Sequence, residues 1–67
     1  MSKRQLECLL WAREGKSSTD IGAILGLSPR TVDDHLAAAC AKLGVRTRTQ
    51  AVAEAMRRDL LPRSPGT

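Results

Sequence analysis

The side chains that could perform acid–base, metal or thiol chemistry are few and lie far apart along the chain. The sequence has one histidine, His35, and two cysteines, Cys8 and Cys40. His35 lies on the flank of an apolar helical face, without the second histidine that a metal site or proton relay would favour. Both cysteines belong to apolar helical patterns, which favours small core residues over a redox pair. We therefore expect a structural histidine, no catalytic residue, no metal, no cofactor and no enzyme.

The balance of charge favours a polyanionic partner without proving one. Eleven Lys and Arg against seven Asp and Glu give a net charge of +4 and a pI near 9.8. Trp11 is the only aromatic residue, so we expect a packing role for it and no single-strand binding by base stacking. Residues 17–44 hold three acidic and two basic residues, whereas the flanking segments are both net positive. Phosphate attraction would therefore come mostly from the flanks.

Small polar residues and glycines divide the chain into four helical segments. The expected helix starts are capped by Ser2, Ser17, Ser28 and Thr47, and three of the ends are Gly15, Gly26 and Gly44. Gln5 and Gln50 predict capping boxes, and Pro29 suits the first position of the third helix. A short turn containing glycine between two helices is typical of a helix-turn-helix. The sequence thus predicts an all-α, four-helix domain with its helix-turn-helix over residues 17–36.

The third predicted helix has an apolar side and a side of small and polar residues. The apolar side, which must face the core, carries Val32, Leu36, Ala39, Cys40 and Leu43. The opposite side carries Arg30, Asp34, Ala37, Ala38 and Ala41. Small residues would let this helix enter a DNA major groove, with Arg30 and Thr31 reaching phosphates or base edges. The same face is equally compatible with a solvated surface rich in helix-favouring alanine.

The fourth predicted helix has an unusually wide apolar arc. Ala51 and Ala55 form its natural core side, while Val52, Met56 and Leu60 extend the arc beyond it. An arc of this width can serve the core and a partner together. In so small a domain it can also belong entirely to the core, and the residues alone leave both readings open.

A series of short motifs runs through nearly the whole chain, from residue 1 to about 61. They are Ser2, Arg4, Gln5, Glu7 and Leu9, then Gly15-Lys16-Ser17, Ile21, Leu25-Gly26-Leu27-Ser28, Thr31-Val32, His35, Lys42-Leu43-Gly44-Val45 and Arg48-Thr49-Gln50-Ala51. In this register they resemble the LuxR-type (GerE-like) helix-turn-helix domain of bacterial transcription regulators. So many positions in register are far more specific than a helix-turn-helix spacing alone.

The resemblance implies a domain that binds double-stranded DNA with its third helix in the major groove. The positions that usually touch the DNA backbone are Lys16, Ser17, Ser18, Arg30 and Thr31, and those that usually face bases are Asp33, Asp34 and Ala37. It also implies a homodimer through the fourth helix, which we assign to Val52, Met56 and Leu60. Finally, it favours a salt bridge between Glu7 and Arg48, although either side chain could simply be solvated.

Two departures from the family pattern stand out. The family often has basic or polar side chains at base-facing positions, whereas Asp33 and Asp34 would repel phosphate, although a carboxylate can accept a hydrogen bond from cytosine N4. Gly22 stands where alanine is usual, and a glycine inside a helix costs about 1 kcal/mol unless close packing needs it.

The sequence therefore predicts a DNA-binding transcription regulator over residues 1–61, followed by a flexible tail over 62–67. The alternative is a protein-interaction module of the same fold that inhibits a regulator by heterodimerisation without reading DNA. No apolar run approaches the roughly 20 residues of a membrane span, and no signal peptide is visible, so we expect no membrane association and a cytoplasmic location. These regulators usually carry an N-terminal sensory or receiver domain, which is absent here; the chain is expected to be a fragment or a free-standing small protein.

Overall fold

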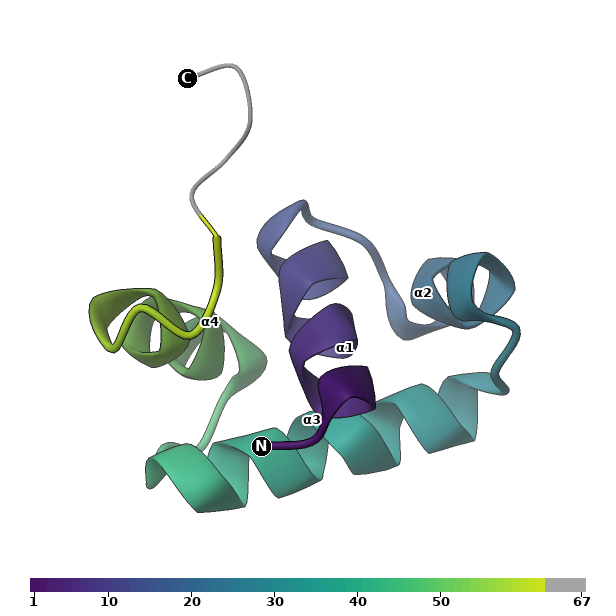
Figure 1. The fold of residues 1–67 in the computed structure, drawn as a ribbon. Coiled ribbons are helices and arrows are strands. Elements are labelled where there is room, and N and C mark those ends of the chain that lie inside the picture. The colour runs from purple at the N-terminus through teal and green to yellow at the C-terminus, as the bar shows by residue number, and fades with distance from the viewer. Residues whose placement is uncertain (63–67) are drawn as a thin grey trace.

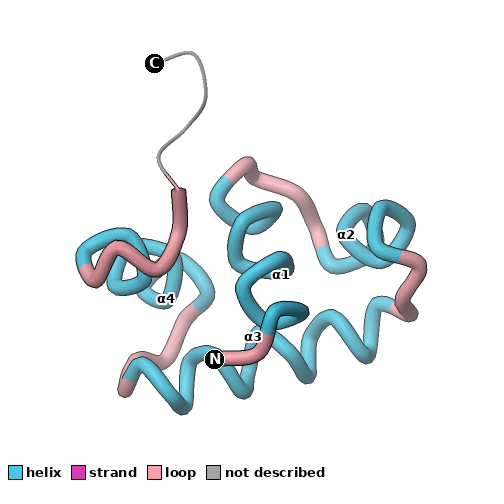
Figure 2. The backbone as a smooth tube through the Cα atoms, viewed as in Figure 1, coloured by secondary structure: helices cyan, strands magenta, loops and turns pink. Residues whose placement is uncertain are grey.

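The computed structural model describes residues 1–62, which form four helices. They are α1 (Lys3–Arg13), α2 (Ser18–Leu25), α3 (Pro29–Leu43) and α4 (Arg48–Arg57). Figure 1 shows α3 as a long base that α1 crosses, with α2 and α4 towards its two ends. Figure 2 shows the same path with short loops between the helices. The predicted all-α, four-helix architecture is confirmed, and no helix among residues 1–62 is long and apolar enough to cross a membrane.

The helices begin and end largely where small residues predict. Ser2, Ser17, Ser28 and Thr47 each accept a hydrogen bond from the backbone N–H three residues further on. The two predicted capping boxes, with Gln5 and Gln50, are both present. The glycines after α1, α2 and α3 have φ angles of 82°, 72° and 70°, which glycine adopts without a steric penalty.

The core lies where α1 crosses α3, and it is completed by α2, α4 and the short segment after α4. Its buried members are Cys8, Leu9, Ile21, Val32, Leu36, Ala39, Leu43, Ala51, Ala55 and Leu61. The predicted core side of α3 is confirmed, with Cys40 half-buried at its edge, and Trp11 packs against the same cluster. His35 is half-buried. Both thiols are free, and burial raises the pKa of Cys8, which makes its thiolate scarcer.

The turn between α2 and α3 explains why residue 22 is a glycine. Gly22 is buried inside α2, and its carbonyl accepts a hydrogen bond from the Leu27 N–H at 2.8 Å. A Cβ placed on Gly22 would lie 2.3 Å from the Leu27 carbonyl oxygen. Close packing of the turn against α2 therefore requires glycine here, despite the cost of glycine within a helix.

The prediction that Leu60 lies on the fourth helix is wrong. α4 ends at Arg57, and Leu60 follows a turn in which Asp59 has a φ of 57°. The Leu60 N–H donates to the Ala55 carbonyl at 2.8 Å and the Asp59 N–H to the Met56 carbonyl at 3.1 Å. This is the left-handed termination that usually employs glycine, so no glycine in the sequence signals where α4 stops.

The chain beyond α4 folds back against α1. The Leu61 side chain is buried in the core, and the Arg13 guanidinium donates a hydrogen bond to the Pro62 carbonyl. Pro62 therefore makes a specific contact, although the predicted tail began with it. The rest of that predicted tail, residues 63–67, lies outside the described residues.

Candidate nucleic-acid interface

The helix-turn-helix predicted over residues 17–36 is formed by α2, a turn over residues 26–28 and the N-terminal part of α3. Ser28 caps α3 by accepting from the Thr31 N–H at 3.1 Å, and its hydroxyl also lies 2.9 Å from the Thr31 hydroxyl. Val32 and Leu36 then anchor α3 in the core. This anchoring directs the opposite side of α3 away from the rest of the domain.

The outward side of α3 is the one that the sequence predicts. Arg30, Asp34, Ala37 and Ala41 are exposed there, and Ala38 is half-buried. The Arg30 and Asp34 side chains form an ion pair across one helical turn, 3.7 Å from Nε to Oδ1, and are 87% and 69% exposed. A pair this exposed contributes little to stability because water and salt screen it. Both side chains can therefore reorganise at small cost when a ligand approaches.

Asp33, the residue before Asp34, bonds to other helices instead of within α3. The Ser18 hydroxyl, from the first residue of α2, donates a hydrogen bond to Asp33 Oδ1. The same hydroxyl accepts a hydrogen bond from Arg48 Nη2 at 2.8 Å, and Arg48 Nη2 lies 3.6 Å from Asp33 Oδ1. Arg48 Nη1 also donates to the Lys16 carbonyl at 3.4 Å. We call Ser18, Asp33 and Arg48 the polar triad.

The predicted salt bridge between Glu7 and Arg48 is not formed. Glu7 pairs with Arg4, one turn earlier on α1, at 3.4 Å, while the Arg48 guanidinium is engaged by Asp33, Ser18 and the Lys16 carbonyl. Each predicted partner thus has a nearer group of the required charge. The ion pair that joins α4 to the rest of the domain at Arg48 runs to α3 and not to α1.

The residues predicted to contact the DNA backbone differ in whether their side chains already bond to other parts of the protein. Lys16 is exposed and directly precedes Ser17, whose hydroxyl accepts from the Asp20 N–H at 3.2 Å. The structure thus brings Lys16, Ser17 and Ser18 to the start of α2, with Asp33 bonded to Ser18. Arg30 and Thr31 lie in the first turn of α3, where they bond to Asp34 and Ser28 and not to that cluster.

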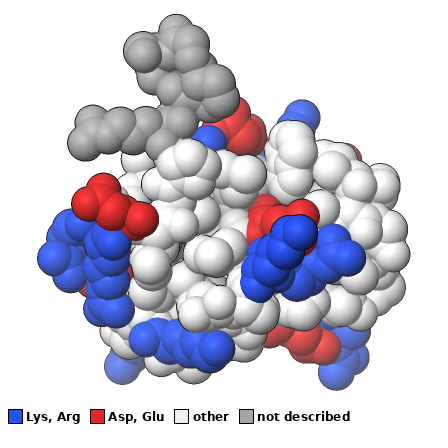
Figure 3. All heavy atoms as spheres, in the orientation of Figure 1, with Lys and Arg blue, Asp and Glu red and all other residues white. Residues whose placement is uncertain are grey.

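Ion pairing leaves a few cations without an acidic partner. In the described part of the chain, Lys3, Lys16, Lys42 and Arg46 form no salt bridge, whereas Asp33 and Asp34 are each paired with an arginine. Figure 3 shows basic side chains at several places on one face and along its edges, in most places next to acidic ones. The two aspartates therefore add less repulsion toward phosphate than their formal charge suggests, because each has a counter-charge within reach.

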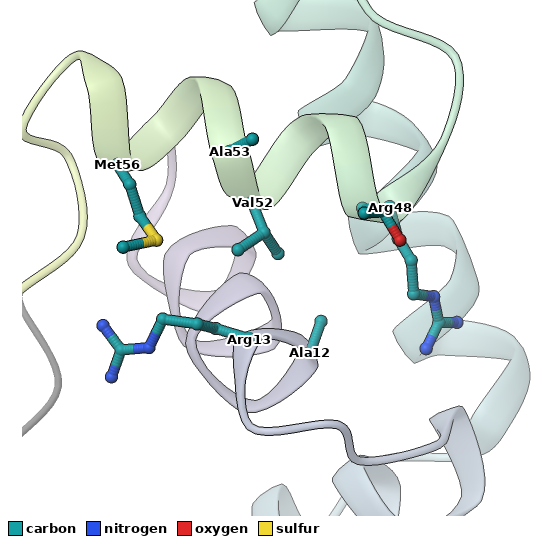
Figure 4. A pocket seen from close by; sticks show the side chains of 7 residues that line it. Ala12, Arg13, Arg48, Val52, Ala53 and Met56 are labelled. Carbon is teal, nitrogen blue, oxygen red and sulfur yellow. The ribbon is translucent and has the colours of Figure 1, made fainter.

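A shallow groove separates the end of α1 from α4. It has a volume of about 390 Å³ and is lined by Ala12, Arg13, Arg48, Thr49, Val52, Ala53 and Met56. Figure 4 shows Val52 between its two ends, with Arg13 and Met56 at one end and Arg48 at the other. Val52 is half-buried, whereas Met56 and Leu60 are each 41% exposed. The predicted dimer residues Val52 and Met56 thus line one groove, and Leu60 lies outside its lining.

The residue that the sequence did not identify as part of this surface is Arg48. Asp33 and Arg48 follow Ser18 by 15 and 30 positions, so no helical periodicity connects the three residues. The signals that were available were a serine at the start of α2 and an unexpected acid on α3. Neither the serine nor the acid indicates which arginine would bind to them.

Comparisons with known proteins agree on one family. Residues 1–55 match the family described as GerE: bacterial regulatory proteins, luxR family. The transcriptional activator protein LuxR of Aliivibrio fischeri is 52% identical over 56 residues, which cover 84% of this chain and 22% of that protein. The transcriptional activator protein BjaR1 of Bradyrhizobium diazoefficiens is 44% identical over 61 residues, which cover 91% of this chain and 25% of that protein.

The fold comparison gives the same result. The solved structure of the transcription factor GerE superposes with a TM-score of 0.87, at 32% identity, over 92% of each chain. The chain spans about a quarter of the length of the two curated relatives, so the likeness concerns this domain alone. The chain belongs to the LuxR family of bacterial regulatory proteins, whose helix-turn-helix domain binds double-stranded DNA in the regulation of transcription.

Proposed function

We propose that this domain binds double-stranded DNA by placing the outward side of α3 in the major groove, as the output unit of a transcription regulator. The observation that carries the proposal is the composition of that side: Ala37 and Ala41 keep it narrow, while Arg30 and Asp34 supply polar groups that are exposed and weakly held. A major groove is wide enough to admit such a helix. Because bacterial DNA lies in the cytoplasm, we place the function there.

In this arrangement the flanks of the helix-turn-helix hold the phosphates and α3 faces the bases. The proposed backbone contacts are Lys16, Ser17, Ser18, Arg30 and Thr31, and the proposed base-facing positions are Asp33, Asp34 and Ala37. Of these three positions, Asp33 is bonded to Ser18 and Arg48 within the domain, which leaves Asp34 and Ala37 as the candidates for direct base contact. Lys16 is the strongest candidate among the first group, because it is exposed, has no acidic partner in residues 1–62 and lies beside the start of α2. The backbone N–H groups at such a start also favour anions.

We further propose that two copies pair through the outer side of α4, using Val52, Met56 and the neighbouring Leu60. Pairing would present two α3 helices to half-sites about 34–36 Å apart, which matches one turn of DNA and a two-fold operator. Since the relatives are about four times as long as this chain, we also propose that the domain works with an N-terminal sensory or receiver domain.

The test of DNA binding is a selection from a pool of random duplexes, followed by titration of the chosen duplex into the 15N-labelled protein. We expect a preferred sequence, and amide shifts over Lys16–Ser18 and residues 30–38 that weaken as salt rises. Selection should be made with the single domain and with two copies joined by a linker. Failure of both to prefer any sequence would contradict the proposal and favour the interaction module.

Lys16 and Lys3 provide a matched pair of variants for the phosphate contact. Both side chains are exposed and form no salt bridge in the described residues, but Lys3 lies in the first turn of α1. Lys16→Ala should reduce the slope of log K against log salt by about 0.9, the value expected for one phosphate. Lys3→Ala removes the same charge and should leave the slope nearly unchanged. Equal effects would mean that only net charge matters.

A further inference from the structure

Two neighbouring aspartates on α3 have opposite surroundings. Within the described residues Asp34 is paired only in its own helix, with an arginine that is itself almost fully exposed. Asp33 is bonded to Ser18 from α2 and paired with Arg48 from α4. The Asp33 side chain is 57% exposed, but it has two partners from two other elements, and turning it outward would break both contacts.

The polar triad also spans a gap in the fold. The backbones of α2 and α4 each pack against α1 and α3, but they do not come close to each other. Arg48 is in the first turn of α4, and its guanidinium reaches both the Ser18 hydroxyl in α2 and the Lys16 carbonyl just before α2. Within residues 1–62 these bonds are therefore the direct connection between α2 and α4.

We propose that Asp33 is a positioning residue of the DNA interface: through Ser18 and Arg48 it fixes the orientation of α3 relative to α2 and α4. This inference rests on the proposed function, since it concerns how α3 is presented to DNA. A base-reading role would require the Asp33 carboxylate to turn outward and give up Ser18 and Arg48. Asp34 has no partner outside α3 among residues 1–62, and facing a base would cost it only the exposed pair with Arg30.

The proposal separates two effects on sequence preference. A side chain that reads one base pair changes the preference at that base pair. A group that orients the whole helix weakens discrimination along the entire site, because every base contact depends on the same placement of α3. Asp33→Asn should therefore flatten the selected motif throughout, whereas Asp34→Asn should change it only locally.

The first experiment examines the triad without DNA. In the labelled protein, the Arg48 side-chain Nε–H resonance should shift in Asp33→Asn and in Ser18→Ala, and should keep its position in Asp34→Asn. Ser18→Thr retains a hydroxyl and should keep the wild-type resonance. An Arg48 resonance that ignores Asp33→Asn, or responds equally to Asp34→Asn, would overturn the proposal whether or not the protein binds DNA.

The second experiment measures binding to the duplex selected by the wild type and to a scrambled duplex, at one salt concentration. Asp33→Asn and Arg48→Gln should each reduce the ratio of the two affinities on the order of tenfold, and the double variant should lose no more than either alone. Circular dichroism must show that all variants are folded at the chosen temperature. The ratio cancels the sequence-independent gain or loss that the altered charges cause.

The outcomes separate the two proposals. If the wild type prefers no duplex, the proposed function fails, and the positioning role falls with it whatever the spectra show. If the wild type selects a sequence but Asp33→Asn keeps the ratio, or changes preference at one base pair and adds independently to Arg48→Gln, the positioning role fails alone. Equal, non-additive losses that extend across the site would support it.

Discussion

The interior of the domain and the surface around the start of α3 are held together by different kinds of contact. In the interior, Leu9, Ile21 and Val32 are fully buried in one core cluster, so their stabilisation follows from the apolar area removed from water. At the surface, Ser18, Asp33 and Arg48 are joined by directional polar bonds that remain within reach of water. The interior therefore decides whether the chain folds, while the surface can change its chemistry with a smaller effect on stability.

The largest expected effect is in the interior. Leu9→Ala should lower the free energy of unfolding by about 2–5 kcal/mol, because it removes buried methyl groups and leaves a cavity. A domain of 67 residues has only roughly 3–10 kcal/mol in total. Urea unfolding followed by circular dichroism should show a variant that is unfolded or nearly so. Ile24→Ala, at a side chain that is 46% exposed, should cost less than about 1 kcal/mol; equal losses would remove the distinction.

The turn between α2 and α3 should give the next largest effect. Gly22→Ala gains about 1 kcal/mol of helix propensity, but its Cβ would meet the Leu27 carbonyl oxygen, and overpacking of this kind costs about 1–3 kcal/mol. We expect a net loss of up to about 2 kcal/mol in urea unfolding. The neighbouring, exposed Ala23 supplies the control, since Ala23→Gly should show the propensity cost alone. A stabilised Gly22→Ala would mean that the turn relaxes freely.

The end of α4 offers a smaller effect of the opposite sign. Asp59 has a positive φ, which glycine adopts more easily. Asp59→Gly should therefore raise the free energy of unfolding by up to about 1 kcal/mol. Asp59→Ala separates the causes, because alanine removes the carboxylate from a helix C-terminus but keeps the backbone strain. If both variants were equally stabilised, electrostatics and not conformation would be responsible.

The smallest effect should come from the ion cluster of Glu54 with Arg57 and Arg58 at the end of α4. Hydrogen bonds from Arg57 and then Arg58 lower the pKa of Glu54 from 4.5 to about 2. A lowered pKa in the folded state gives stability that is fully present above pH 4.5 and is lost as the pH falls toward 2. As the pH falls through this range, the free energy of unfolding should decrease less for Glu54→Gln than for the wild type. The difference should shrink in high salt, because both arginines are exposed.

Residues whose role is local were predictable from the sequence, and those whose role depends on distant partners were not. Ser17, Ser28 and Gly44 act within one turn of their own helix, so their types alone indicated helix starts and an end. The core face of α3 followed from the helical period. The position of α4's end did not, because Asp59 takes a conformation that its residue type seldom signals.

The surface shows the same division. The exposure of Arg30 and Ala37 followed from the period of α3. The partner of Arg48 did not, since choosing between Glu7 and Asp33 requires knowing where α4 begins relative to α2. Gly22 is intermediate: its sequence context suggested close packing as a condition, and the Leu27 carbonyl oxygen supplies the neighbour.

The burial of Leu61 determines where this domain can be truncated or joined to a fusion partner. The last helix ends at Arg57, but the side chain of Leu61 fills part of the interior and Arg13 holds the Pro62 carbonyl. A chain truncated directly after the helix would expose the neighbours of Leu61 to water, even though every helix remained complete. A unit that keeps these contacts therefore extends through residue 62, and a fusion partner attached any earlier would replace a structural residue with a linker.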